Sequence, residues 1–287
     1  MNVKKLTITD SDYPQKLVRL SSPPKELFYL GANPQAWANE TCVAVVGTRA
    51  ITPYGRQVTE QLVTELCNRG VHIVSGLAFG VDAVAHTAAV KAGGQHVAVL
   101  AHGLNQIHPT SNTELAKDIL RGGGTLLSEY EIGTPSLKQN FIARNRIVSG
   151  LATALLITEA SEKSGTLHTA RFALEQGIDV FVVPGNITSP QSAGTNNLIK
   201  AGAHPITSID DITNILKLKS PSVATYRHKG DSDDEKALLT LLYDGTTDGH
   251  ELLVSSSLSV EMFTQALTML ELSGKIYPLG NNHWAPK

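Results

Sequence analysis

Three consecutive segments in the middle of the chain indicate its architecture: Lys138-Gln-Asn-Phe-Ile-Ala-Arg-Asn-Arg-Ile-Val-Ser-Gly-Leu151, Ala154-Leu-Leu-Ile157 and Ser164-Gly-Thr166. The first is typical of a helix with a basic start. The second is short, apolar and uncharged, as expected for a strand covered on both faces of a parallel sheet. The third is a glycine turn that opens another helix, and the free N–H groups of such a turn favour an anion.

Two arginines of the first segment face different ways if residues 141–151 are helical. Helical periodicity places Arg144 on the apolar face that also carries Phe141 and Ile147, whereas Arg146 points away. Arg144 then either projects into the ligand crevice of an α/β sheet or forms a structural ion pair, for example with Glu129 or Glu159. The cluster of Lys138, Arg144 and Arg146 beside a glycine turn favours a phosphate-rich ligand.

The composition is that of a globular protein. The 287 residues suffice for a large core and a small second domain, and a net charge of −2 requires any nucleic-acid site to be a local patch. Cys42 and Cys67 are too few for a disulfide framework. The beginning of the chain lacks the apolar core of a signal peptide, and no apolar run is long enough to span a bilayer. The expected location is the cytoplasm, without membrane insertion.

The order of apolar runs predicts four regions. Residues 1–40 form a short N-terminal preamble. Residues 41–217 alternate strands, near 43–46, 71–74, 97–100, 125–127, 154–157 and 179–183, with helices, which predicts an α/β fold with a doubly wound parallel sheet. Residues 218–232 have little apolar periodicity and form a predicted linker. Residues 233–287 are expected to form three helices and a hairpin, a small winged-helix-like domain.

Three glycine turns fall at predicted strand ends, at Gly47, at Gly76 and Gly80, and at Gly165. Such ends open on one edge of a parallel sheet, so the turns should converge. With Arg49 in the first turn they predict a groove that follows phosphates. A nicotinamide dinucleotide is disfavoured because the first turn is not G-x-G-x-x-G, and the ten histidines show no metal-binding spacing. We therefore expect no cofactor and no metal site.

Five groups of short motifs occur in order between residues 41 and 216: Val45-Val-Gly-Thr-Arg49 with Tyr54-Gly55, Ser75-Gly-Leu-Ala-Phe-Gly-Val-Asp82, Asn140-Phe-Ile-Ala-Arg-Asn-Arg-Ile147, Ser164-Gly-Thr-Leu-His-Thr-Ala170, and Val183-Pro-Gly185 with Gly194-Thr-Asn-Asn-Leu-Ile199. The ordered set closely resembles the DprA/Smf family of DNA-processing proteins. The C-terminal layout is similar to the winged-helix module that many members carry.

The resemblance implies an extended Rossmann-like fold, a homodimer, and binding of single-stranded DNA. It further implies delivery of that DNA to the RecA recombinase during natural transformation, with single-strand-binding protein as a further partner. In the family, residues at the positions of Arg49, Lys138 and Phe141 contact DNA, although Phe141 could equally belong to the core. Together with the glycine turns, the full set of candidate DNA-binding residues is Gly47, Thr48, Arg49, Ser75, Gly76, Gly80, Lys138, Phe141, Arg144, Asn145, Arg146, Ser164, Gly165 and Thr166.

Two alternatives belong to other functional classes. Nucleotide phosphoribohydrolases carry an acid in the turn that here reads Glu162-Lys-Ser-Gly-Thr-Leu-His-Thr169, and Thr169 occupies the place of that acid, so we expect no enzymatic activity. A winged-helix DNA regulator is the second alternative. Residues 231–287 hold nine acids and three bases, a charge of −6, whereas the remainder has a charge of +4. A surface so acidic repels a duplex.

Overall fold

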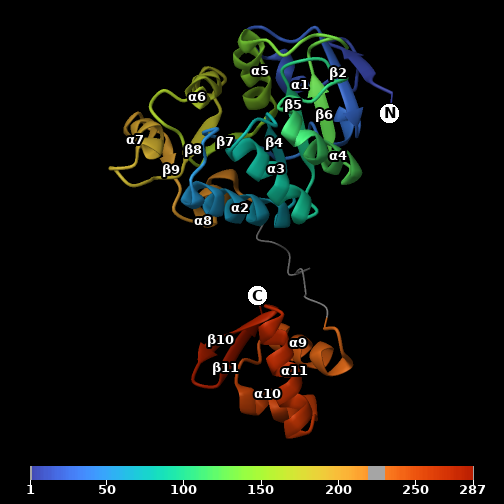
Figure 1. The fold of residues 1–287 in the computed structure, drawn as a ribbon, viewed down its shortest axis with the longest axis vertical. Helices are drawn as coiled ribbons and strands as arrows, with labels where there is room; N and C mark the ends of the chain where they lie inside the picture. Colours follow the sequence, from blue (N-terminus) through green and yellow to red (C-terminus); the bar gives the residue numbers. More distant parts are fainter. Residues whose placement is uncertain (1, 219–229, 287) are drawn as a thin grey trace. The chain divides into compact units, whose positions relative to one another are not determined.

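The computed structural model describes residues 2–218 and 230–286. The chain divides into two compact units, Met1–Ser220 and Pro221–Lys287, which are described separately below (Figure 1). Most of the predicted linker 218–232, namely residues 219–229, lies outside the described residues. No helix among the residues described is both long enough and apolar enough to cross a membrane.

A mixed nine-stranded sheet forms the centre of the first unit. Its strands are β1 (Lys4–Thr7), β2 (Glu26–Gly31), β3 (Cys42–Val46), β4 (His72–Ser75), β5 (His96–Leu100), β6 (Thr125–Ser128), β7 (Ala154–Ile157), β8 (Asp179–Val182) and β9 (His204–Pro205). Their order is β1-β2-β6-β5-β4-β3-β7-β8-β9, and all neighbours from β6 to β9 are parallel. The predicted α/β class with a doubly wound parallel sheet is confirmed.

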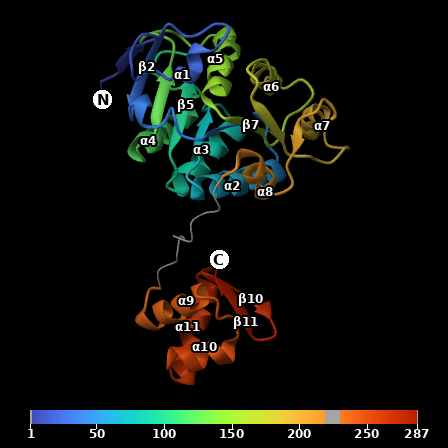
Figure 2. The same cartoon turned by 180° about the vertical axis from the view of Figure 1, so that it is seen from behind.

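Helices cover both faces of this sheet (Figures 1 and 2). They are α1 (Gln15–Val18), α2 (Pro53–Asn68), α3 (Val81–Lys91), α4 (Thr113–Arg121), α5 (Lys138–Leu151), α6 (Thr166–Glu175), α7 (Ala193–Lys200) and α8 (Ile209–Leu216), with 3-10 turns at Pro34–Ala36, Thr110–Asn112 and Pro190–Ser192. Helices α1, α5 and α6 share a core with Ala44 and Val46, whereas α2, α3 and α8 pack on Val43 and Val45. Successive side chains of a strand point to opposite faces of the sheet, and here each face packs in its own core. This explains why the strands are apolar throughout.

The first 40 residues contribute more to the sheet than the sequence indicated. Strands β1 and β2 extend it in antiparallel fashion beyond β6, although we had predicted no strand there. Trp37 is buried and its Nε1 donates to Thr125 Oγ1 at 3.1 Å, while the Tyr13 hydroxyl donates to the Pro24 carbonyl at 2.6 Å. A four-residue strand such as Lys4-Lys-Leu-Thr7 gives too short an alternation to be predicted from sequence.

The strand order reverses between β3 and β7. From β3 the chain proceeds through β4 and β5 to β6 in one direction, and from β7 through β8 to β9 in the other. Loops leaving the carboxyl ends of β3 and β7 therefore diverge to opposite faces, and a crevice opens between them.

The second unit has its own core. Helices α9 (Asp233–Tyr243), α10 (Gly249–Ser256) and α11 (Val260–Leu272) precede the antiparallel hairpin of β10 (Ile276–Gly280) and β11 (His283–Pro286). Leu238, Leu252 and Phe263 bring the three helices together, and Ile276 joins them from the hairpin. This order of elements confirms the predicted winged-helix-like layout.

Four histidines of the first unit are buried or half-buried with ring nitrogens that lack a hydrogen-bond partner. They are His72 on β4, His86 on α3, His96 on β5 and His102 after β5. Burial lowers the pKa of each one, most strongly that of His86, whose ring also meets His96 edge-on at 5.8 Å. Because these rings are buried or half-buried, we assign them to the packed interior. Within residues 2–218 and 230–286, no cluster of potential ligands could hold a metal ion.

These histidines should make the first unit sensitive to acid. An unfolded histidine takes up a proton near its ordinary pKa of about 6.5, whereas the buried rings resist protonation. The free energy of unfolding is therefore expected to be unaffected by these groups above pH 7 and to fall as the pH drops below about 6.5. Each ring can contribute up to about 1.4 kcal/mol per pH unit.

Urea denaturation between pH 7.5 and 5 would measure this slope. His86→Leu should make it shallower, whereas the same change at the exposed His168 should not. An identical pH dependence in wild type and His86→Leu would contradict the assignment.

Candidate nucleic-acid interface

A cleft of about 750 Å³ lies where the chain turns after β3, β4 and β7. The sheet reversal places it there, as the convergence of glycine turns predicted. Ten of the fourteen candidate residues line it: Gly47, Thr48, Arg49, Lys138, Phe141, Arg144, Asn145, Ser164, Gly165 and Thr166. Ser75, Gly76, Gly80 and Arg146 are outside its lining.

Hydrogen bonds join the first and third glycine turns. The Thr48 amide donates to the Glu159 carbonyl at 2.7 Å, and the Thr166 hydroxyl donates to the Gly47 carbonyl at 2.8 Å. A side chain at Gly47 would overlap Val81 and place a Cβ 2.7 Å from the Glu159 carbonyl oxygen, so this close approach requires glycine. The two turns consequently form one wall of the cleft.

The buried carboxylate of Asp82 stabilises the second glycine turn. Asp82 accepts the Gly76 amide at 3.1 Å and the Ala78 amide at 3.3 Å. Gly80 has a φ of +75°, and a Cβ there would overlap the Thr48 carbonyl. Gly76 and Gly80 therefore shape the turn next to the cleft, and Ser75, whose hydroxyl donates to the Val45 carbonyl at 2.6 Å, ties β4 to β3.

Arg144 enters the interior, and it partners neither of the two acids that the sequence suggested. Its side chain is only 3% exposed, and Nη1 donates to the carbonyl oxygens of Gly76, at 2.7 Å, and Val99. Burial lowers the pKa of Arg144 to about 10, and the charge of Asp82 opposes that shift. Burial likewise raises the pKa of Asp82, while Arg144 and the two amide donors act to lower it. Arg144 touches the cleft but primarily supports its floor.

Arg146 and Glu159 have structural partners. Arg146 forms a two-pronged ion pair with Glu129, at 2.6 and 2.9 Å, and is not among the residues that line the cleft. Glu159 accepts the Thr52 amide at 2.9 Å and the Thr52 hydroxyl at 2.7 Å. Helical periodicity had correctly separated Arg146 from Arg144, but the expected contribution of Arg146 to a phosphate cluster is not supported by its position.

Exposed cations and aromatic rings meet at the mouth of the cleft. The Arg49 guanidinium lies over the Phe141 ring, 5.5 Å from its centroid, and His108 meets the same ring edge-on at 5.7 Å. Lys138 is the exposed first residue of α5, one turn before Phe141. Phe141 therefore lines the cleft, which distinguishes it from the buried face formed by Ile147 and Val148.

The cleft has little acidic character. Among the described residues that line it, Asp82 is the only carboxylate, and it is buried. Thr169, at the position where related hydrolases carry an acid, is buried in the wall. The lining also includes Lys163, so that Arg49, Lys138 and Lys163 present three exposed cations to a ligand.

The model of the family described as DNA recombination-mediator protein A matches residues 4–217. The chain belongs to this family. Protein Smf of Escherichia coli K12 is 44% identical over 205 residues, which are 71% of this chain and 54% of Smf. DNA processing protein DprA of Bacillus subtilis 168 is 40% identical over 210 residues, 73% of this chain and 70% of that protein. The matched region thus spans about half the length of Smf.

Two solved structures of the family are similar to this chain over three quarters of its length. DprA from Streptococcus pneumoniae has a TM-score of 0.69 at 38% identity, covering 75% of this chain and 74% of its own. DprA from Helicobacter pylori has a TM-score of 0.67 at 34% identity, covering 75% and 95% respectively. The latter structure is described by its single-stranded DNA binding mode.

Several lining residues were not singled out from the sequence. Phe79, in the second glycine turn, is 50% exposed and lines the cleft, as do Lys163, His108, His168 and Gln191. Phe79 and Lys163 adjoin residues that we did select, and an apolar ring inside a glycine turn was a usable signal. His108 and Gln191 come from loops whose approach depends on tertiary structure.

The buried position of Arg144 predicts that its loss affects stability first. Arg144→Ala would leave Asp82 without its buried counter-charge and two carbonyls without a donor. The free energy of unfolding, measured by urea denaturation, should fall by about 3–5 kcal/mol. Arg49→Ala, which removes an exposed guanidinium from the same cleft, should cost less than about 1 kcal/mol. Equal stability losses in the two variants would show that Arg144 is not a structural cation.

Proposed function

We propose that the cleft of the first unit binds single-stranded DNA. The observation that carries the proposal is the pairing of Arg49 with Phe141 beside Lys138, which offers phosphates a cation next to a ring that can stack on a base. Backbone cations and aromatic platforms are how proteins bind single strands without reading their sequence. Phe79, which is 50% exposed, gives the cleft a second aromatic ring besides the half-buried Phe141.

The contents of the cleft favour a single strand over a duplex. A stacked base must be unpaired, and its flat face is accessible only in a single strand. The family relationship to the Helicobacter pylori protein, whose structure concerns single-stranded DNA binding, supports the same ligand.

Binding should be length-dependent, tolerant of sequence and weakened by salt. Arg49→Ala, Lys138→Ala and Lys163→Ala should each lower the affinity and flatten the salt slope by up to about 0.7 per lost phosphate contact. Phe141→Ala should weaken binding by roughly 1–3 kcal/mol with less change in slope. Fluorescence anisotropy of labelled oligonucleotides between 50 and about 300 mM salt measures both quantities.

Lys200→Ala is the matched control, because Lys200 is an exposed lysine on α7 outside the cleft. It should leave affinity and slope nearly unchanged. If folded Arg49→Ala binds as tightly as Lys200→Ala, the first glycine turn is not part of the binding site.

We further infer that the protein acts as a homodimer that loads RecA recombinase onto incoming DNA during natural transformation. Family membership supports a role in recombination. A mediator of this kind must hold a strand without demanding a sequence, which suits an aromatic and cationic cleft. Single-strand-binding protein would then be the competitor that it has to displace or accommodate.

The loading role predicts faster RecA assembly on a strand already coated with single-strand-binding protein. The rate of RecA-dependent ATP hydrolysis after addition of the chain, with cognate partner proteins, is the measurement. Arg49→Ala should reduce the acceleration in proportion to its lost DNA affinity. Unchanged assembly kinetics would contradict loading, and a purely monomeric species in sedimentation would contradict the dimer.

We also infer that the cleft is a binding site without glycosidic activity. A phosphoribohydrolase needs a free carboxylate at the scissile sugar, whereas here Thr169 holds that position and Asp82 is committed to two amides. Incubation with nucleoside monophosphates should release no free base above the rate of a buffer control. Base release proportional to protein concentration would restore the enzyme alternative.

The alternative of a winged-helix DNA regulator is not favoured by the second unit. Helix α11, the third helix of that layout, contains Glu261 and Glu271 and no lysine or arginine. A helix that reads the major groove depends on phosphate neutralisation by nearby cations.

A further inference from the structure

Helix α11 exposes an apolar stripe that the core of its unit does not use. Its inward positions, from Phe263 to Leu270, are buried in the three-helix core. Outward lie Met262, Gln265, Met269 and Leu272, and the three apolar members are 44%, 50% and 79% exposed. Their spacing of three and four residues is that of a helix-pairing seam. The stripe runs from Met262 to Leu272, eleven residues that extend over about 15 Å of helix.

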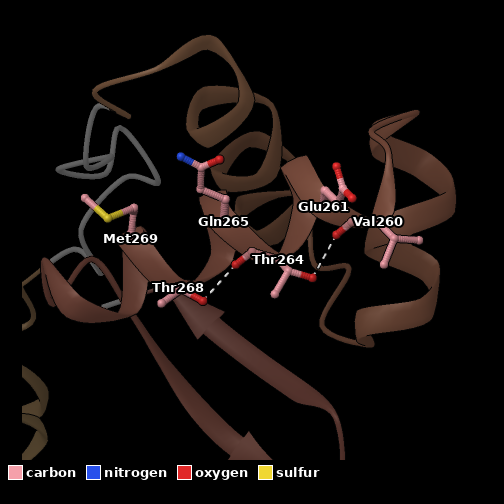
Figure 3. Close-up of a pocket in the computed structure, with 6 residues that line it drawn as sticks. All are labelled: Val260, Glu261, Thr264, Gln265, Thr268 and Met269. Carbon is pink, nitrogen blue, oxygen red and sulfur yellow. Dashed lines mark hydrogen bonds between the residues drawn. The ribbon is translucent and has the colours of Figure 1, made fainter.

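A shallow groove runs beside this stripe, lined by Val260, Glu261, Thr264, Gln265, Thr268 and Met269 (Figure 3). The hydroxyls of Thr264 and Thr268 each donate to the carbonyl four residues earlier, both at 2.8 Å. Their hydrogen-bond donors are thereby satisfied within the helix, which leaves their methyl groups as surface. The groove is consequently more apolar than its composition implies.

The charged side chains that α11 contributes beside the stripe are both negative. Glu261 and Glu271 stand near its two ends, and α11 carries no cation. In the described part of this unit, Lys236 pairs with Asp233 at 2.7 Å, and Lys275 pairs with Asp231 at 2.6 Å. A second copy of α11 laid on the stripe would bring only further carboxylates. A helix with cationic flanks would instead complement it.

We propose that the exposed face of α11 is a docking site for a cationic amphipathic helix of a partner protein. Leucine-like side chains of the partner pack against Met262, Met269 and Leu272, and its lysines or arginines reach Glu261 and Glu271. Unbranched, flexible methionines suit such a surface because they adapt to the incoming side chains. This proposal does not rest on the proposed binding of DNA in the cleft, so either proposal can fail without the other.

The methionines make the site directly observable. The chain has three, Met1, Met262 and Met269, so two of the three methyl-¹³C-methionine NMR signals report on α11. The probe is a synthetic 18-residue helix with leucines at positions spaced three and four apart and flanking lysines. Its matched controls are the same peptide with glutamates in place of the lysines, and a scrambled cationic sequence. A 20-base-pair duplex at 150 mM salt is the fourth ligand.

The cationic helix should shift the Met262 and Met269 signals of the full chain, with a dissociation constant at least ten-fold lower than that of either control peptide. The duplex should shift neither signal. The double substitution Glu261→Lys and Glu271→Lys should lower the affinity for the cationic helix at least ten-fold. Glu251→Lys, the same type of substitution at a single position on α10, should not. Equal shifts by the scrambled peptide, no shift by the cationic helix, or a shift by the duplex would overturn the proposal.

The substitution Met269→Ser tests how much the apolar side chains contribute to binding of the cationic helix. Met269 is exposed, so this substitution should not disturb the core. This substitution should lower the affinity for the cationic helix at least five-fold, as measured from the remaining Met262 signal. Leu279→Ser, at a similarly exposed position of the hairpin, should leave the affinity within two-fold. Equal effects of the two substitutions would show that the stripe is not the docking surface.

Discussion

Arg144 brings a full positive charge into the interior of an α/β domain, and the shape of the cleft depends on how that charge is satisfied. Its guanidinium donates to carbonyls at the ends of two parallel strands, through Gly76 and Val99. Asp82 supplies the counter-charge while it also accepts two amides of the glycine turn. An unpaired buried charge would be costly, so these groups stabilise the turn only as a set. Gly76 is part of the set because any side chain there would occupy the space of the guanidinium.

Helix α5 links this buried set to the surface of the cleft. Lys138 and Phe141, six and three residues before Arg144, line the cleft. Arg146, two residues after Arg144, pairs with Glu129 instead. One helix therefore supplies an interior cation, a surface cation, an aromatic ring and a lateral ion pair. Because Arg144 fixes the helix against the strand ends, Phe141 is held where Arg49 can lie over its ring. The side chains proposed to bind DNA are therefore positioned by contacts within the protein itself.

The sequence predicted the parallel sheet and the meeting of the glycine turns because both follow from local rules. Uncharged apolar runs alternated with helices, and parallel strands direct their carboxyl ends to one edge. The destination of Arg144 could not be predicted in this way, since helical periodicity gives a direction but not the carbonyls it reaches. Strands β1 and β2 were missed because their pairing is non-local and β1 is short. His108 reaches Phe141 through a loop, and loop paths are not encoded in periodicity.

The first unit and the linker carry a net positive charge and residues 231–287 a net negative one, but electrostatic interactions act over a short range. At physiological salt, charges more than about 8 Å apart are largely screened, so the proposed binding of DNA in the cleft would depend mainly on nearby charges such as those of Arg49, Lys138 and Lys163. The acidic character of residues 231–287 acts in the same local way, on whatever contacts α11. Within a short range, the carboxylates disfavour phosphates and favour cationic side chains, whereas Arg49, Lys138 and Lys163 do the reverse. A single chain can therefore carry one basic and one acidic surface, with opposite preferences for charged groups, while its net charge is only −2.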